Sequence, residues 1–212
     1  MPKFFIKHVT QYNYSNLVID GASQIMLHPI EDAYQKVPSH TLSINTNPKI
    51  HTRKDFFENT VGSFMVIEPH DYLSIISEIE VITKTKPIPE DLNSASSQWE
   101  HLKELKQNPE FINYLKYLVF DGTPEIEVLL SKKDLNEETP YSLVLFLSEY
   151  IFKNFKYIQG VTKVDSKLDH VWDLKAGVCQ DFAYILLQMV RMAGIPARYV
   201  SGYICPNESC SR

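Results

Sequence analysis

The first part of the chain alternates between apolar and polar residues, as half-buried β-strands do. The alternation is clearest in residues 39–45, Ser-His-Thr-Leu-Ser-Ile-Asn, and in residues 78–81, Glu-Ile-Glu-Val. Residues that favour turns separate such runs at positions 45–48, 59–62 and 68–71. This spacing predicts an antiparallel β-sandwich of short strands between Phe4 and about Thr85.

Helical spacing replaces the alternation after a polar, proline-containing segment at residues 86–97. Asn108-Pro109 and Thr139-Pro140 each join a capping residue to a proline that suits a first helical turn, so each predicts the start of a helix. A third helix is predicted from about Cys179 to Ala193, because its apolar residues recur every three or four positions before Gly194.

The order of these elements predicts an α+β chain with two domains. Residues 1–86 form the β-rich domain, and residues 98–212 form a helical domain that ends in the Cys179 helix and at least one strand. That strand is expected over residues 198–204, Arg-Tyr-Val-Ser-Gly-Tyr-Ile, because β-branched and aromatic residues dominate it.

Composition narrows the class of protein. Of the 212 residues 44% are hydrophobic and 12% aromatic, which is too apolar for an intrinsically disordered chain. The net charge is -5 and no run of Lys or Arg occurs, so nucleic acid is not an expected partner. The longest apolar stretch, residues 143–152, contains Glu149 and is too short for a membrane span.

Cysteine usage and the N-terminus both favour a cytoplasmic protein. Residues 1–8 lack the apolar stretch of a secretory signal, since Lys7 and His8 interrupt it. The three cysteines, Cys179, Cys205 and Cys210, do not form the even-numbered framework of a secreted disulfide protein.

Cys179 stands at the predicted N-terminus of the third helix. Unpaired N–H groups and the positive end of the helix dipole stabilise a thiolate at such a position. The same N–H groups suit the oxyanion of a tetrahedral intermediate, and Gly177 lets the chain turn tightly just ahead. A small buried cysteine is the alternative, because its spacing from Phe182 and Leu186 also places Cys179 toward the apolar face.

The sequence around Cys179 resembles that of a known family. Residues 177–183, Gly-Val-Cys-Gln-Asp-Phe-Ala, and residues 194–203, Gly-Ile-Pro-Ala-Arg-Tyr-Val-Ser-Gly-Tyr, are similar to the nucleophile helix and following strand of bacterial transglutaminase-like proteins. This resemblance implies a papain-like core in which Cys179 is the nucleophile of a Cys-His-Asp triad. No cofactor and no metal are implied.

The resemblance also covers the β-rich region that precedes the catalytic core in the bacterial subgroup. It rests on four segments, residues 11–14, 23–29, 55–59 and 69–73. Glu58 departs from the subgroup, which usually has Gly before this Asn. The family's histidine and aspartate follow the cysteine on later strands, whereas no histidine follows Cys179 here, so the chain is expected to be a truncated, inactive part of the catalytic domain.

The resemblance implies a thiol enzyme that acts on peptide or isopeptide bonds of a protein or peptide substrate, through a thioester at Cys179. A non-catalytic protein-binding module on the same scaffold is the alternative. His170, the only histidine near Cys179 in sequence, is a less favoured base, and Trp172 either shapes a substrate groove or packs in the core. A metal site of the three cysteines is disfavoured because they form no Cys-x-x-Cys pair.

Overall fold

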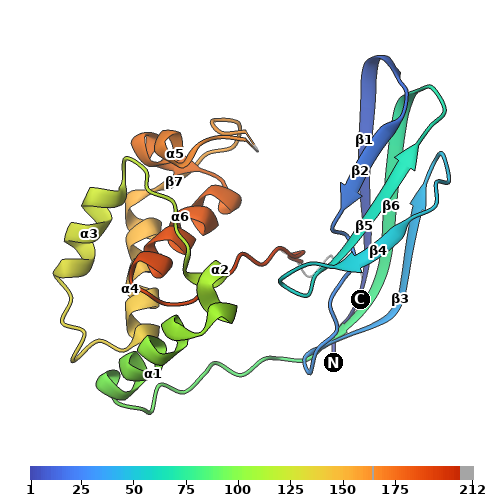
Figure 1. The fold of residues 1–212 in the computed structure, drawn as a ribbon. Coiled ribbons are helices and arrows are strands. Elements are labelled where there is room, and N and C mark those ends of the chain that lie inside the picture. Colours follow the sequence, from blue (N-terminus) through green and yellow to red (C-terminus); the bar gives the residue numbers. More distant parts are fainter. Residues whose placement is uncertain (164, 206–212) are drawn as a thin grey trace. The chain divides into compact units, whose positions relative to one another are not determined.

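The computed structural model describes residues 1–163 and 165–205. The chain divides into two compact units, one built around Met1–Ile88 and the other formed by Pro89–Tyr203. Antiparallel sheets make up the first unit and helices dominate the second (Figure 1), so the predicted α+β class is confirmed. Every helix in the described part of the chain is too short or too polar to cross a membrane.

The first unit contains two antiparallel sheets of three strands, ordered β1-β6-β3 and β2-β5-β4 in the described residues. Their strands are β1 (Lys3–Val18), β2 (Gly21–Ile25), β3 (Gln35–Ile44), β4 (His51–Lys54), β5 (Thr60–Val66) and β6 (His70–Thr83). The two alternating runs seen in the sequence are confirmed, since they fall in β3 and β6. One hydrophobic cluster draws on both sheets and includes Ile44, Phe64 and Ile75.

The turn before β5 lies earlier than the sequence pattern indicates. Residues 59–62 were expected to turn, but the strand already begins at Thr60. The Asp55 carboxylate forms the reversal by accepting hydrogen bonds from the N–H groups of Phe57 (2.8 Å) and Asn59 (2.9 Å). Glu58 has φ 62°, the left-handed region that glycine enters most readily, which explains why glycine suits this position in the resembling subgroup.

All helices of the described residues lie in the second unit. They are α1 (Ala95–Gln107), α2 (Ile112–Leu115), α3 (Thr123–Ser131), α4 (Pro140–Asn154), α5 (Leu168–Leu174) and α6 (Cys179–Met192), with a 3₁₀ turn at Pro109–Phe111. The helices predicted from residues 139–140 and from Cys179 are confirmed. The helix predicted from Asn108 is short and ends at Leu115. The sequence pattern gave no boundaries for α1, whose only buried residue is Ala95.

The strand predicted over residues 198–204 is wrong, because this segment has no regular secondary structure. Val200 and Ile204 are 69% and 87% exposed. A strand is stable only when a neighbouring strand satisfies its N–H and C=O groups, and the described residues place none beside it. High β-propensity was therefore not sufficient.

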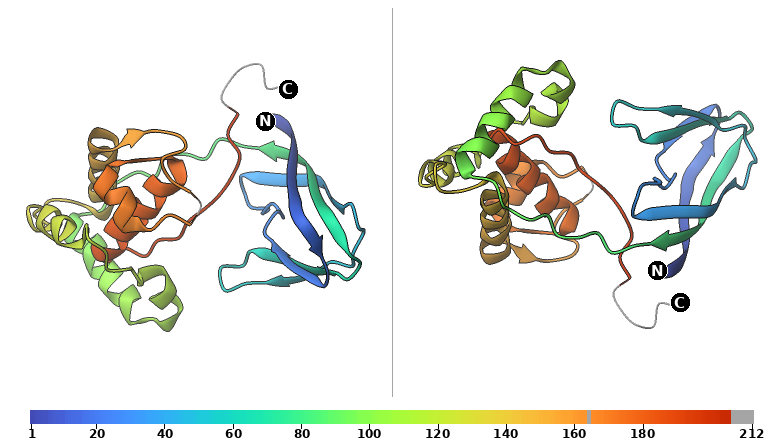
Figure 2. Two further views of the ribbon diagram at one scale, coloured as in Figure 1. Left: turned by 90° about the horizontal axis from the view of Figure 1, so that it is seen from above. Right: turned by 90° about the horizontal axis from the view of Figure 1, so that it is seen from below.

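Helix α6 is central to the second unit. It packs against α2, α4 and α5 (Figure 1 and Figure 2). Ile185 and Met189 of α6 and Leu143 and Leu147 of α4 are fully buried in one hydrophobic cluster. Each such side chain stabilises the fold by about 1.5–3 kcal/mol, so α6 is firmly held.

Two histidines lie close together in the first unit. The rings of His28 and His40 are 5.0 Å apart and nearly perpendicular. His40 Nε2 is hydrogen-bonded to the Ser77 hydroxyl at 2.9 Å, whereas His28 Nε2 is buried without a hydrogen-bond partner among the described residues. Burial lowers the pKa of both imidazoles, and the nearby Lys54 ammonium lowers the pKa of His28 further. The folded state therefore favours the neutral form of both rings.

We expect the free energy of unfolding to decrease as the pH falls from about 7 to about 5.5. In this range the unfolded chain takes up protons near the usual histidine pKa of 6.5, whereas the folded state resists protonation at His28 and His40. Urea unfolding across the range should show the decrease, and His28→Gln should make it smaller. The same substitution at exposed His101 is the control. An unchanged pH dependence in His28→Gln would contradict the assignment.

Limited proteolysis can test the predicted domain division into residues 1–86 and 98–212. The Asp91 carboxylate accepts hydrogen bonds from the Gln98 side chain (2.7 Å) and from the Thr139 hydroxyl, so the segment after Asp91 is fastened to the helical unit. Residues 84–90 are all exposed. We expect a non-specific protease to cut first at residues 86–90 and to leave two resistant fragments, identified by mass. First cuts within the strands would contradict two domains.

Candidate active site at Cys179

Cys179 is the first residue of α6, and its side chain is exposed. The first hydrogen bond of the helix runs from the Phe182 N–H to the Val178 carbonyl at 3.2 Å. The N–H groups of Cys179 and Gln180 precede it and have no partner within the helix. The exposed thiol excludes the alternative in which Cys179 is a buried packing residue.

A buried carboxylate closes the N-terminus of α6. Asp181 is 6% exposed, and its Oδ2 accepts hydrogen bonds from the Val178 N–H (2.8 Å) and the Thr162 hydroxyl (2.7 Å). The bond to Val178 is one half of a capping box. Two donors and the positive end of the helix dipole together offset the cost of burying this charge.

Gly177 is needed for space, not for a special backbone conformation. The glycines with positive φ in the described residues are Gly160 and Gly194, so the expectation that Gly177 supplies a tight turn is wrong. A Cβ atom on Gly177 would instead lie 2.5 Å from Oδ2 of Asp181 and 3.0 Å from its Cγ. The absent side chain leaves the room that the buried carboxylate occupies.

The backbone ahead of Cys179 is fixed by a short parallel pairing between β7 (Lys156–Tyr157) and β8 (Ala176–Gly177). The Lys156 N–H donates to the Lys175 carbonyl at 2.8 Å, and the Ile158 N–H donates to the Gly177 carbonyl at 3.0 Å. These bonds hold the chain up to Gly177. The next residue, Val178, is held by the hydrogen bond from its N–H to Asp181. Cys179 therefore follows a backbone segment that is hydrogen-bonded to Ile158 at Gly177 and to Asp181 at Val178.

Polar side chains near the other end of α6 bind the backbone of neighbouring segments. The Gln188 carbonyl oxygen accepts from the Leu118 N–H at 2.8 Å. The Arg191 guanidinium donates to the carbonyl of Ala197, at 2.7 Å from Nη2, and to that of Lys116, at 2.7 Å from Nη1. Burial lowers the pKa of Arg191. These contacts fasten the segment that follows α6 to the segment that follows α2.

Trp172 and His170, which the sequence singled out, are not part of the site at Cys179. Trp172 is 5% exposed and packs edge-on against Phe120 and obliquely against Phe155, so it is a core residue and does not line a groove. His170 is an exposed residue of α5, and no hydrogen bond joins it to Cys179 in the described part of the chain.

Among the described residues, no group of three or more His, Cys, Asp or Glu side chains is arranged so that it could hold a metal ion. Cys210, one of the three cysteines considered as ligands, lies outside these residues. Sequence reasoning missed Asp181 and Thr162, although a carboxylate at the third helical position is a known capping signal.

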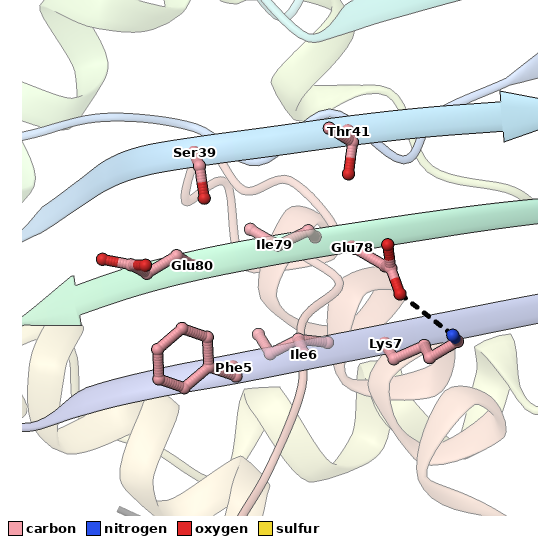
Figure 3. A pocket seen from close by; sticks show the side chains of 8 residues that line it. All are labelled: Phe5, Ile6, Lys7, Ser39, Thr41, Glu78, Ile79 and Glu80. Atoms are coloured by element: carbon pink, nitrogen blue, oxygen red, sulfur yellow. Dashed lines mark ion pairs between the residues drawn. The ribbon is translucent and has the colours of Figure 1, made fainter.

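The first unit has a groove on its β1-β6-β3 sheet, and charged pairs lie along it. Figure 3 shows its lining from β1, β6 and β3, with Glu78 and Glu80 on the central strand. Lys7 pairs with Glu78 at 2.9 Å, and Lys3 pairs with Glu80 at 2.7 Å. None of the residues predicted to carry chemistry lines this groove. Its charges are neutralised between neighbouring strands, as is usual for cross-strand pairs on an exposed face.

Comparison with known families reproduces the two-part organisation. Residues 4–82 match the family model for the bacterial transglutaminase-like N-terminal region. Residues 129–211 match the model for the transglutaminase-like superfamily, and this second match contains Cys179, Asp181 and Thr162.

Longer proteins resemble almost the whole chain. Uncharacterized proteins of Mycobacterium tuberculosis and Mycobacterium leprae are 28% and 26% identical to it, with 95% of this chain and 66% and 71% of the relatives covered. The crystal structure of a "putative cysteine protease" from Cytophaga hutchinsonii matches with a TM-score of 0.71 and 20% identity, over 92% of this chain and 64% of that chain. The chain thus spans 66% of the length of the first relative, and the structural match establishes the fold.

The close approach at Gly177 can be tested directly. We expect Gly177→Ala to lower the free energy of unfolding by about 1–3 kcal/mol, because the new methyl group overlaps the buried Asp181 carboxylate. Gly202→Ala is the matched control, since a Cβ there meets nothing within 4 Å. Urea midpoints of the two variants should differ clearly. Equal midpoints would show that Asp181 moves aside without cost.

Proposed function

We propose that this chain, which belongs to the transglutaminase-like superfamily, carries the nucleophile of a thiol enzyme that cleaves or exchanges peptide or isopeptide amide bonds. The matches to the two transglutaminase-like family models support, in general terms, a family of thiol enzymes. The finer proposal assigns the nucleophile to Cys179 and gives the enzyme a protein or peptide as substrate.

The exposed position of Cys179 at the start of a buried helix carries the proposal. The thiol is accessible to a substrate, while Ile185 and Met189 fix the helix behind it in the core. An anion at this position faces N–H groups that lack helical partners, and the helix dipole favours a negative charge there. A thiolate and a developing oxyanion both benefit from such a site.

The chemistry follows from these groups. The Cys179 sulfur attacks the carbonyl carbon of an amide, the carbonyl oxygen becomes an oxyanion, and the N–H groups of Cys179 and Gln180 are placed to stabilise it. Collapse of this intermediate breaks the C–N bond, releases the protonated amine and leaves a thioester on Cys179. Water then gives hydrolysis, whereas an amine gives transamidation.

A general base must take the thiol proton and return it to the leaving amine. No histidine of the described residues is hydrogen-bonded to Cys179, and the family resemblance assigns this role to a histidine on a later strand. We therefore infer that residues 1–212 supply the nucleophile without a complete proton-transfer system. Loss of general acid–base catalysis costs about 10²–10⁴ in rate.

Acylation of the 212-residue chain by an activated peptide ester tests the proposal, because a good leaving group reduces the need for a base. We expect one acyl group on the peptide that contains Cys179, found by mass after digestion, and none on that peptide in Cys179→Ala. We expect no measurable turnover of the corresponding amide. A longer chain that carries the histidine implied by the family resemblance should turn the amide over.

Three results would count against the proposal or a part of it. Acylation that persists in Cys179→Ala at an unchanged rate would show that another group is the nucleophile. An extended chain that forms no thioester and cleaves no amide would favour the protein-binding alternative. Amide turnover by residues 1–212 that is lost in His170→Ala would make His170 the base.

A further inference from the structure

The carboxylate of Asp181 connects three segments of the chain around Cys179. It lies on α6, it accepts from Val178 just after β8, and it accepts from Thr162 in the loop that follows β7. We propose that Asp181 and Thr162 are positioning residues, which together keep the N–H groups at the start of α6 available to the thiolate and to the substrate oxyanion. This inference rests on the proposed function of Cys179.

The position of the carboxylate is closely defined. Both hydrogen bonds end on the same oxygen, Oδ2, at 2.7 and 2.8 Å. The Gly177 backbone lies against this oxygen, because even a Cβ on Gly177 would be only 2.5 Å from it. With 6% of Asp181 exposed, water hardly competes for these bonds.

The segment that leads to Thr162 is paired with the same backbone. The Ile158 N–H extends the pairing of β7 by donating to the Gly177 carbonyl at 3.0 Å, and Thr162 follows four residues later. The Thr162 hydroxyl donates to the Asp181 carboxylate. The backbone at Gly177 and Val178 is thus hydrogen-bonded to Ile158 and to Asp181, and Thr162 in turn holds the Asp181 carboxylate.

This arrangement has a chemical consequence. Asp181 is an anion in the first turn of the same helix whose N–H groups must serve the thiolate. A carboxylate there is free to accept from first-turn N–H groups itself, and would then compete with the thiolate and the oxyanion. Thr162 and Val178 direct it to the N-cap side, where it occupies the Val178 N–H and leaves those of Cys179 and Gln180 accessible.

Alkylation of Cys179 by iodoacetamide provides the test. Thr162→Val replaces the hydroxyl with a methyl group of similar size, so Asp181 loses one of its two donors. We expect the alkylation rate of the folded chain at neutral pH to fall about two- to fivefold, the range expected for losing helix-terminus stabilisation of an anion. The pH–rate profile should move to higher pH. Thr162→Ser keeps the hydroxyl and should restore the rate.

The chain contains a matched control. Thr139 is also a half-buried threonine whose hydroxyl caps a helix, accepting from the Ser142 N–H at 3.1 Å, but it lies at the start of α4. Thr139→Val should lower the melting temperature without changing the alkylation of Cys179. Because Cys179 is already exposed, a faster reaction through uncovering is not expected in either variant.

A double variant tests whether Thr162 acts through Asp181. In Asp181→Asn the buried anion is absent, so adding Thr162→Val should have no further effect on the alkylation profile. Additive effects would show that Thr162 acts independently. An unchanged rate and profile in Thr162→Val, together with a lower melting temperature, would reduce the contact to a purely structural one and overturn the inference.

The two proposals fail in different ways. If the activated ester never acylates Cys179 but Thr162→Val still slows alkylation, the proposed function fails and the positioning role stands. If Cys179 is acylated and both reactions proceed in Thr162→Val at the wild-type rate, the proposed function stands and the positioning role fails.

Discussion

The burial of one face of α6 is the constraint on which the candidate site depends. Ile185 and Met189 are fully buried against α4, so the helix cannot slide or rotate without opening the core. A residue at the end of a fixed helix has a fixed position, and Cys179 occupies that place while remaining exposed. Packing thus determines where the thiol lies, although the thiol itself takes no part in the core.

Side-chain hydrogen bonds near both ends of α6 add to the packing that holds the helix in place. Helix ends carry N–H and C=O groups without helical partners, and buried ones must be satisfied from elsewhere. Asp181 serves the N-terminal end, while Gln188 and Arg191 serve backbone carbonyl and N–H groups of neighbouring segments. The N-terminal bonds involve Val178 and leave the N–H groups of Cys179 and Gln180 outside. These two N–H groups are the ones that the proposed thiolate and oxyanion would use.

The first unit is stabilised in a different way. Its two sheets share an apolar cluster, and its exposed face carries Lys–Glu pairs between neighbouring strands. Such pairs contribute modestly, about 0.2–1 kcal/mol each, and favour the correct register. His28 and His40 are polar groups placed in partly buried surroundings, where burial lowers the pKa of both imidazoles.

The sequence by itself determined the class of the fold, the family and the identity of the candidate nucleophile. Strand alternation in β3 and β6 and the apolar spacing of α6 are local patterns, and such patterns follow from which face of an element is buried. Thr139-Pro140 likewise predicted the start of α4. Residues 177–183 carried the resemblance because a short contiguous motif needs no knowledge of distant contacts.

Only the tertiary structure decided the features that depend on distant partners. The strand predicted over residues 198–204 is absent, since a strand needs a neighbour that sequence cannot supply. Trp172 was assigned to the core by Phe120 and Phe155, and Gly177 owes its place to the Asp181 carboxylate. The bond from Thr162 to Asp181 joins residues 19 positions apart, so no local pattern revealed it. Periodicity records burial, whereas these contacts arise from the meeting of separate segments.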